Sequence, residues 1–320
     1  MIRKLASLSL AAVLLAVLSP SGAAAQVRSY VASNGGGTAC TLAAPCSSLQ
    51  NAIEATQSGG EVYCLDPGAS DGAQGVAITR SITIDCRGGS IWNVTVNGTG
   101  ISVLLRNVIV NSFNIPGASG VGVDLLNGAL TLENCVVQNW NASTGSSIGI
   151  GIRVAPPAGV TARLHVTDSL IRNNGLAASG GGIIIQPAGS GSARVVIERT
   201  RVENNTFGIF ANGIGSTGVI SVQVRDSVVS DSAFSGISAF TSAGHSITSI
   251  TVDRSSSLLS GANGILAQGT GGFVSLTETT VVSNVTGLNA VSGGAIFSYQ
   301  NNRLTGNVSD GAPTAVLAVK

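Results

Sequence analysis

The chain contains few charged and few aromatic residues. Only 10% of its 320 residues are Asp, Glu, Lys or Arg, and 4% are Phe, Trp or Tyr. An average domain is about 25% charged. The net charge of +1 gives no electrostatic reason to expect nucleic acid or anionic lipid as a partner. The two histidines are far apart and no acidic repeat accompanies them, so we expect no metal site and no cofactor.

Long apolar runs are also missing beyond the N-terminus. Residues 1–25 combine a basic start at Arg3 and Lys4, an apolar run, and small residues from Ala23 to Ala25. This pattern is typical of a secretory signal peptide cut after Ala25. No later run is long enough to span a bilayer as a helix, so we expect no membrane span after cleavage. The predicted location is secreted: periplasmic, extracellular or at the cell surface.

Glycine is abundant, with 43 residues, and an eight-residue pattern recurs along the chain. The segment LENCVVQN begins at position 132, and related segments begin at 84, 105, 166, 197, 224, 252, 276 and 299. A second series keeps the same order and consists of a glycine followed by an aliphatic residue. Its glycines are Gly122, Gly151, Gly182, Gly208, Gly236, Gly264 and Gly287. Two markers in phase indicate one structural unit repeated many times.

Each repeat contains short stretches of alternating apolar and polar residues, such as Leu130-Thr131-Leu132, separated by Gly, Asn and Ser clusters. Alternation predicts strands with one buried face, and the separators predict turns. No helical periodicity occurs between the strands, which excludes βαβ units. We therefore predict an all-β fold, a right-handed parallel β-helix (solenoid) of nine or ten coils, with one repeat in each coil.

Stacked coils lie ~4.8 Å apart, so equivalent residues form ladders along the axis. The fourth position of the repeat places Cys135 among small residues, between Val108 and Ser169, which predicts a buried and inert thiol. The third position reads Asn107, Asn134, Asp168, Arg199, Asp226, Arg254, Glu278 and Asn301. Its charges alternate in sign from Asp168 onward, which predicts ion pairs between adjacent coils.

The other four cysteines are predicted to form two disulfides. Cys40 and Cys46 bracket a short loop, TLAAP. Aligning EVYC with TIDC places Cys64 beneath Cys86 on the next coil, and one coil spacing lies within the Cα separation that a disulfide requires.

The segment 47–56, SSLQNAIEAT, predicts a short N-terminal capping helix over the open end of the first coil. Leu49, Ala52 and Ile53 recur at helical spacing, and Ser47 is the expected N-cap. The predicted organisation is a signal peptide at 1–25, a Cys loop and capping helix at 26–60, the parallel β-helix at 61–307, and a C-terminal tail at 308–320.

Three segments carry a resemblance to a known family: PCSSLQNAIEATQSGGEVYCLDPG, ITRSITIDC and SYQNNRLTGNVSDG. They resemble a family of secreted bacterial right-handed parallel β-helix proteins of the pectin-lyase-like superfamily, over most of residues 28 to 320. The resemblance implies the fold and export, and it supplies no catalytic residues. Motifs of the superfamily's hydrolases, lyases and methylesterases are missing from the sequence, which contains no Asp-Asp pair.

One polar cluster is a candidate for a functional site. His165 is predicted to point outward, with Arg163 and Arg194 at equivalent outward positions on adjacent coils. Glu133 and Glu198 are predicted on the same face, two coils or ~9–10 Å apart, near the upper limit for an inverting carboxylate pair. We consider Glu133, His165 and Glu198 as candidate catalytic residues, and the two arginines as candidate ligands of a glycan. A merely solvated polar face is the alternative.

An apolar stripe is the second candidate. The outward positions of the Gly-Ile strand read Asp124, Arg153, Ile184, Phe210, Ser238, Leu266 and Asn289. Ile184, Phe210 and Leu266 together need a cover, so we expect the C-terminal tail or a long loop to lie over them. Otherwise they form a surface for a partner or ligand.

These patterns favour a monomeric extracellular or cell-surface protein that binds a polysaccharide, a cell-surface glycan or a protein, or has a structural role. The alternative is a polysaccharide-active lyase, hydrolase or epimerase with a non-standard site on the β-helix face. Carboxylates converging in a groove would favour the enzyme, and a flat face with its charges paired along ladders would favour binding.

Overall fold

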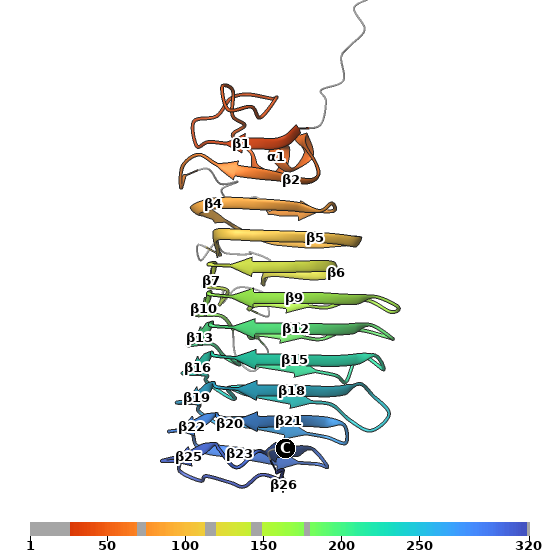
Figure 1. Cartoon of the computed structure of the whole chain (residues 1–320), viewed down its shortest axis with the longest axis vertical. Coiled ribbons are helices and arrows are strands. Elements are labelled where there is room, and N and C mark those ends of the chain that lie inside the picture. Colours follow the sequence, from red (N-terminus) through yellow and green to blue (C-terminus); the bar gives the residue numbers. More distant parts are fainter. Residues whose placement is uncertain (1–25, 69–74, 113–119, 142–148, 176–179, 319–320) are drawn as a thin grey trace, which may run out of the picture.

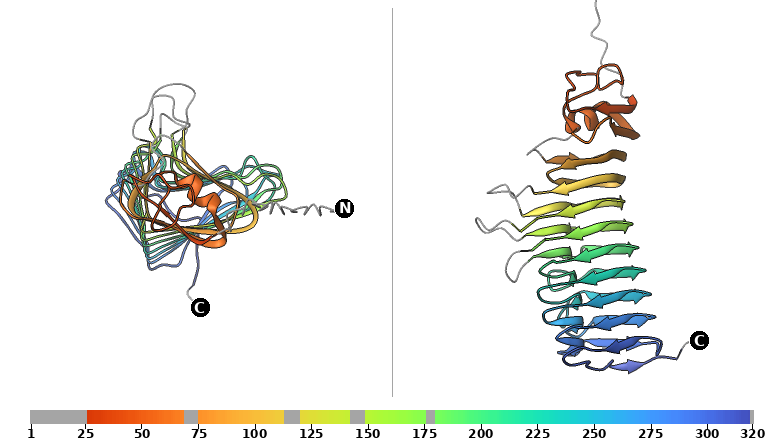
Figure 2. Two further views of the ribbon diagram at one scale, coloured as in Figure 1. Left: turned by 90° about the horizontal axis from the view of Figure 1, so that it is seen from above. Right: turned by 90° about the vertical axis from the view of Figure 1, so that its left-hand side faces the viewer.

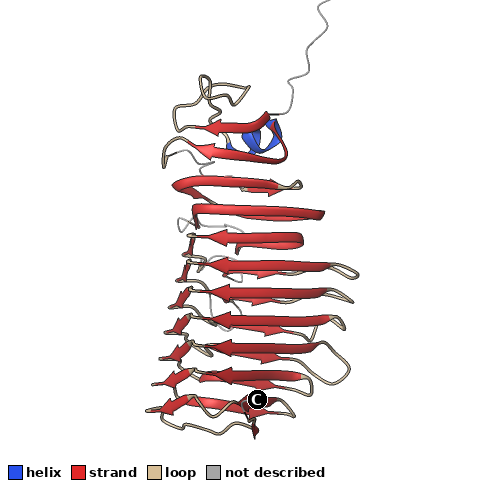
Figure 3. Cartoon of the chain, in the orientation of Figure 1, coloured by secondary structure: helices blue, strands red, loops and turns tan. Residues whose placement is uncertain are grey.

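The computed structural model describes residues 26–68, 75–112, 120–141, 149–175 and 180–318, and the predicted signal peptide at 1–25 lies outside them. Within these ranges the chain winds into an elongated stack of coils, with the N-terminal coils at one end and the C-terminal coils at the other (Figure 1). Strands make up nearly all of its regular structure (Figure 3). Every strand pairing between successive coils is parallel, which confirms the predicted parallel β-solenoid.

Each coil has three faces, which we number in chain order. Face 1 carries the longest strands, and the long strands β4, β5 and β6 run on around corners into other faces. The strands of face 1 are β1 (Gln26–Val31), β2 (Thr56–Cys64), β4 (Ile82–Ile91), β5 (Val94–Asn111), β6 (Val121–Glu133), β9 (Thr161–Thr167), β12 (Ser192–Glu198), β15 (Val219–Arg225), β18 (Ile247–Asp253), β21 (Gly272–Thr277), β24 (Ala295–Ser298) and β26 (Ala315–Val316).

Faces 2 and 3 complete the coil. Face 2 contains the ends of β4 and β5, followed by β7 (Val136–Gln138), β10 (Leu170–Arg172), β13 (Arg201–Glu203), β16 (Val228–Ser230), β19 (Ser256–Leu258), β22 (Thr280–Val282) and β25 (Arg303–Thr305). Face 3 contains β3 (Val76–Ile78), the starts of β5 and β6, and then β8 (Ile150–Val154), β11 (Gly181–Ile185), β14 (Ile209–Asn212), β17 (Ile237–Phe240), β20 (Asn263–Gln268) and β23 (Thr286–Val291).

The strand register agrees with the repeat found in the sequence. Leu132, which opens LENCVVQN, pairs with Val166, and Val166 pairs with Ile197. The same position continues through Val224 and Val252. All five side chains are fully buried, so the repeat marks the residues that stack along the core.

The second series, the glycines before the face 3 strands, has a steric cause. A Cβ on Gly208 would lie 2.5 Å from the carbonyl oxygen of Gly236, and one on Gly236 would lie 2.9 Å from that of Gly264. The same contact occurs at Gly122, Gly151, Gly182, Gly264 and Gly287. Each coil therefore approaches the next so closely that only glycine fits.

A ladder of small polar side chains lies inside the corner between faces 1 and 2. The backbone N–H of Cys135 donates to Ser169 Oγ at 3.0 Å, that of Thr200 to Ser227 Oγ at 3.1 Å, and that of Ser227 to Ser255 Oγ at 3.1 Å. Cys135 is buried and unpaired. Burial raises the pKa of its thiol to about 11, and this agrees with the inert, space-filling role predicted for it.

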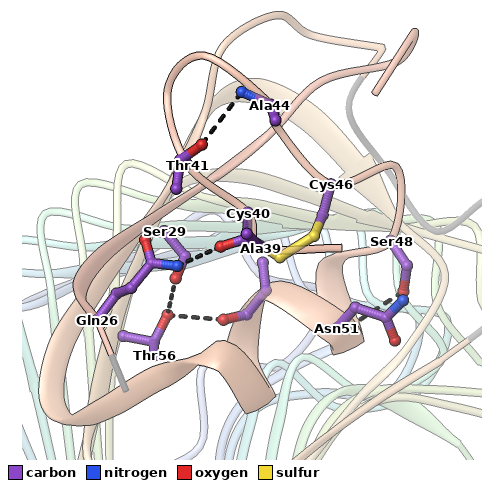
Figure 4. Close-up of a disulfide and its surroundings, with 11 residues drawn as sticks. Gln26, Ser29, Ala39, Cys40, Thr41, Ala44, Cys46, Ser48, Asn51 and Thr56 are labelled. Carbon is purple, nitrogen blue, oxygen red and sulfur yellow. Dashed lines mark hydrogen bonds between the residues drawn. A yellow bond between two sulfur atoms is a disulfide. The ribbon is translucent and has the colours of Figure 1, made fainter. Parts of the chain in front are cut away.

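The N-terminal end differs from the prediction in its boundaries. The helix α1 (Leu49–Ala55) is present, with Leu49, Ala52 and Ile53 buried, but its N-cap is Ser48 rather than Ser47, because Ser48 Oγ accepts the N–H of Asn51 (Figure 4). The helix ends at Thr56, whose hydroxyl donates to the Ala52 carbonyl and from which β2 begins directly. Strands β1 and β2 therefore bring residues 26–31 and 56–60 into the parallel sheet.

Both expected disulfides are present near this end. Cys40 and Cys46 close the loop beside α1, with Cα atoms 4.6 Å apart (Figure 4). Cys64 and Cys86 join adjacent coils, with Cα atoms 4.4 Å apart. Seen along the axis, α1 lies over the coils at this end (Figure 2).

Candidate functional site

The register of face 1 brings the predicted polar residues onto adjacent rungs. Arg163 pairs with Arg194, and His165 lies two residues further along β9. Glu133 and Glu198 flank Thr167 on successive rungs, so they are two coils apart, as the spacing predicted. Strand alternation turns all five side chains outward, because Leu164, Val166, Val195 and Ile197 between them are buried.

Glu198 is the centre of an ion-pair network. Its Oε2 lies 3.0 Å from His165 Nε2, and its Oε1 lies 2.6 Å from Arg225 Nη2 on the next coil. Arg199 Nη1 approaches the same carboxylate at 4.0 Å. The Glu198 side chain is only 17% exposed. Its contacts with His165 and Arg225 hold this carboxylate in place, which suits it to orienting His165 or to stabilising the coil register.

Glu133 has a separate partner. Its Oε2 lies 3.3 Å from Arg106 Nε, and Arg106 also approaches Asp85 at 3.9 Å. The two glutamates are thus each drawn to a different arginine instead of converging on a shared point. This arrangement resembles a face with charges paired along ladders more than a pair of carboxylates placed around a scissile bond.

Arg163 and Arg194 stand apart from this network. Both side chains are exposed, and within the described part of the chain neither one makes a hydrogen bond or ion pair with a carboxylate. They occupy neighbouring rungs, ~4.8 Å apart along the coil axis. Arg163 also lines a cleft of about 370 Å³, together with segments 99–102, 127–129 and 159–161. Two adjacent positive charges without a counter-ion favour an anionic ligand.

The charge ladder at the corner between faces 1 and 2 is paired as predicted. Arg199 Nε lies 2.8 Å from Asp168 Oδ1, and Arg254 Nε lies 2.9 Å from Asp226 Oδ1. All four residues have positive φ angles of 43° to 51°. The guanidinium of Arg199, assisted by the Thr167 hydroxyl, lowers the pKa of Asp168 to about 2. Arg254 likewise lowers the pKa of Asp226.

The apolar stripe of face 3 lies in the predicted register. Arg153, Ile184, Phe210, Ser238 and Leu266 follow one another through adjacent strands. Ile184 is only 4% exposed, and Phe210 and Leu266 are half-buried.

The C-terminal tail does not cover this stripe. Ala315–Val316 instead forms β26 and pairs with β24 on face 1, and Ser309 pairs with Thr286 below the last coil.

Phenylalanine side chains pack on one another along the stripe. The ring of Phe207 stacks on those of Phe210 and Phe234, with centroids 5.0 and 5.2 Å away, and Phe240 lies 5.8 Å from Phe210. The aromatic contacts between adjacent coils stabilise the stack.

Several residues of these clusters escaped the sequence reasoning. Arg106 is the partner of Glu133, and Phe207 and Phe234 extend the stripe from turns that precede the face 3 strands. Arg225 was not missed, because it follows Glu198 at the same repeat position and forms the ion pair that opposite charges on adjacent coils favour. The ladder positions of Arg106 and Arg225 were visible in the repeat, one coil from each glutamate. Phe207 and Phe234 lie in turns whose length differs between repeats, so aligning the repeats does not show which residues they contact on adjacent coils.

Comparisons with known proteins support the fold. No protein-family model and no curated protein sequence matches the chain. Among solved structures, the crystal structure of pectate lyase Pel9A matches with a TM-score of 0.60 and 14% sequence identity, over 91% of this chain and 78% of that one. At this identity the likeness concerns the fold alone.

The described part of the chain is therefore a parallel β-helix of the right-handed type, the fold that it shares with pectate lyase Pel9A. Within the described ranges, no helix is both long enough and apolar enough to cross a membrane. In the same part of the chain, no three His, Cys, Asp or Glu side chains are grouped to hold a metal ion.

Proposed function

We propose that the protein is an extracellular glycan-binding β-helix, and that Arg163 and Arg194 on face 1 bind carboxylate groups of an acidic polysaccharide. The observation that supports this most directly is the placement of the two exposed arginines on adjacent rungs without an acidic neighbour. The other arginines on this face lie beside carboxylates: Arg28 beside Glu61, Arg106 beside Glu133, and Arg225 beside Glu198. A guanidinium without a partner is available for bidentate contact with a ligand carboxylate.

The surrounding geometry suits a linear polymer. Face 1 is a long parallel sheet whose rungs repeat every ~4.8 Å, and the cleft beside Arg163 opens next to the start of β9. Half-buried His165 lies two residues from Arg163, on the same side of the strand. Its bond to Glu198 leaves the other ring nitrogen, Nδ1, available to a sugar hydroxyl.

Further parts of the proposal concern the whole chain. Cleavage after Ala25 would export a monomer in which α1 covers the first coil, residues 61–307 form the main body of the β-helix, and residues 308–320 form the tail. The two disulfides are compatible with an oxidising, extracellular location. The fold is also that of pectate lyase Pel9A, whose name refers to an acidic polysaccharide.

A catalytic role for Glu133, His165 and Glu198 is the second candidate function, and the contact of His165 with Glu198 favours it. A histidine oriented by a carboxylate is a common arrangement for a general base. The separate pairing of Glu133 with Arg106 weighs against a two-carboxylate hydrolysis, so a lyase or epimerase reaction that removes a proton is the form that fits this cluster.

The test is calorimetric titration of polygalacturonate oligomers into the wild-type protein and into the double variant Arg163→Gln/Arg194→Gln. Loss of two charge-assisted contacts should weaken binding at least about tenfold. The matched control is Arg201→Gln/Arg303→Gln, which removes the same charge from face 2 and should bind normally. Equal affinities for both double variants would refute the site. Ultraviolet absorbance of unsaturated products, compared between wild type and His165→Ala, separates the lyase from simple binding.

A further inference from the structure

A second polar groove lies at the corner between faces 2 and 3, away from the arginine pair. It has a volume of about 690 Å³ and crosses several adjacent coils. Its lining residues are mostly small and polar. They are Asn141, Asn173, Asn174, Gly175, Asn204, Asn205, Thr206, Asp231, Ser232, Ala233, Leu259 and Gly261.

Two rows of amide side chains form the floor of this groove. The inner row is structural, because its buried side chains accept backbone N–H groups of the preceding coil. Asn174 Oδ1 accepts the N–H of Trp140 at 3.2 Å, and Asn205 Oδ1 accepts that of Asn174 at 3.0 Å. The outer row is accessible from the groove. There Asn204 Nδ2 donates to Asn173 Oδ1 at 2.7 Å, and Asn173 Nδ2 donates to Asn139 Oδ1 at 3.2 Å.

The outer row has a direction, because every amide donates toward the N-terminal end. Asn139 completes it by donating to Asn111 Oδ1 at 3.0 Å. Hydrogen bonds aligned in one direction polarise one another, so electron density accumulates on the last oxygen, Asn204 Oδ1. That oxygen would normally accept a bond from an amide on the next coil.

The next rung holds Asp231, which cannot donate. Glu203 pairs with Ser230, so Asp231 follows at the position equivalent to Asn204, and both residues have φ of 53°. An ionised carboxylate accepts hydrogen bonds only. Within the described part of the chain, nothing donates to Asn204 Oδ1 or to the Asp231 carboxylate. The row therefore ends in acceptors without donors, at the surface of the groove.

The following rung is apolar. Ser230 pairs with Leu258, which places Leu259 after Asp231. Leu259 is 49% exposed and has a φ of 57°, an uncommon conformation for leucine. Acceptor oxygens beside an exposed aliphatic side chain match a sugar ring, which carries hydroxyl donors at its edge and C–H groups on its face.

We propose that this groove is a second glycan-binding site, which takes the hydroxyl groups of a neutral oligosaccharide on Asn204 and Asp231 and a sugar C–H face on Leu259. A calcium ion fits less well, because it takes about six to eight oxygen ligands, usually with several carboxylates, and Asp231 is the one carboxylate in the lining. The site differs from the arginine pair in location and in ligand charge.

The Asp231→Asn variant tests the proposal, because its amide can donate to Asn204 Oδ1 and extend the row by one rung. Asparagine also tolerates the positive φ, so the variant should melt at the wild-type temperature or above it. Cellohexaose, xylohexaose and mannohexaose are titrated in EDTA into wild type, Asp231→Asn, and the control Glu54→Gln, which removes one exposed negative charge on α1. A second variant, Leu259→Asn, removes the apolar contact at a position where asparagine is also tolerated.

We expect at least one hexasaccharide to bind the wild type and the Glu54→Gln control equally, and to bind Asp231→Asn at least about tenfold more weakly. Leu259→Asn should weaken the same ligand. Failure of all three sugars to bind the wild type, or unchanged binding by Asp231→Asn, would overturn the proposal. Binding of Ca²⁺ alone by the wild type, and not by Asp231→Asn, would also overturn it. None of these results bears on whether Arg163 and Arg194 bind polygalacturonate, so the two proposed sites are tested separately.

Discussion

Substitution of Gly208 by alanine tests the close packing of successive coils. The new Cβ would lie 2.5 Å from the Gly236 carbonyl oxygen and 2.5 Å from Val229 Cγ1. Ordinary contact begins at 3.4 Å, so one side must move by about 0.9 Å. The Gly236 carbonyl has little freedom to do so, because it accepts the N–H of Ile209 at 2.8 Å in the ladder between coils.

The expected cost follows from these contacts. Overpacking in a core costs about 1–3 kcal/mol, and a disturbed backbone hydrogen bond adds about 1 kcal/mol. Alanine lowers the conformational entropy of the unfolded chain relative to glycine, which offsets about 0.4–1 kcal/mol of this cost. We therefore expect a net loss of about 1–3.6 kcal/mol in the free energy of unfolding. For an m-value of about 3 kcal/mol/M, the urea midpoint falls by about 0.3–1.2 M.

The assay is urea unfolding followed by tryptophan fluorescence, since Trp140 is buried in the stack. The control is Gly36→Ala, at an exposed glycine whose added Cβ meets nothing within 4 Å. The control should unfold at the wild-type midpoint or slightly above it. If Gly208→Ala and Gly36→Ala unfold at the same urea concentration, the proposed steric reason for the glycine series is wrong.

Two further predictions concern titratable groups. Because the folded pKa of Asp168 is lowered to about 2, the stabilisation from its pair with Arg199 is present above about pH 3.9 and is lost as the pH falls toward 2. Carboxyl NMR should give a midpoint near 2 for Asp168 and a higher one in Arg199→Gln, and a wild-type midpoint near 4 would contradict the pairing. The folded pKa of Cys135 is raised to about 11, so its burial stabilises the fold below about pH 8.5 and this contribution is lost as the pH rises toward 11. A thiol reagent at pH 8 should label no cysteine in the native protein and one in urea, and rapid labelling of the native protein would show that the thiol is accessible.

Much of the fold was predictable because residues at equivalent positions of successive repeats contact each other on adjacent coils. In such a stack, each buried or corner position has nearly the same environment as the position one repeat away. That is why the Cys135–Ser169 neighbours, the Cys64–Cys86 disulfide and the Asp168–Arg199 pair could all be read by aligning segments. The alignment needed no knowledge of side-chain conformation.

Boundaries and partner choices were less predictable. The helix begins after Ser48 because its side chain, and not that of Ser47, reaches the N–H of Asn51. Glu198 could have paired with a residue above or below it, and it contacts both His165 and Arg225. Asp253 faces Arg225 on the adjacent strand, but its carboxylate lies 2.6 Å from Arg254 instead. Long flexible side chains can reach several neighbours of similar distance, so the sequence does not select among them.

The amino-acid sequence by itself determined the coil, its period and the residues that stack along its axis, because a repeating backbone imposes the same steric and burial requirements on every turn. Only the tertiary structure decided which charges remain without partners, which amide oxygens lack a donor, and where the C-terminal tail lies. Those properties depend on side-chain direction and on loops of unequal length, and neither of these is repeated from coil to coil.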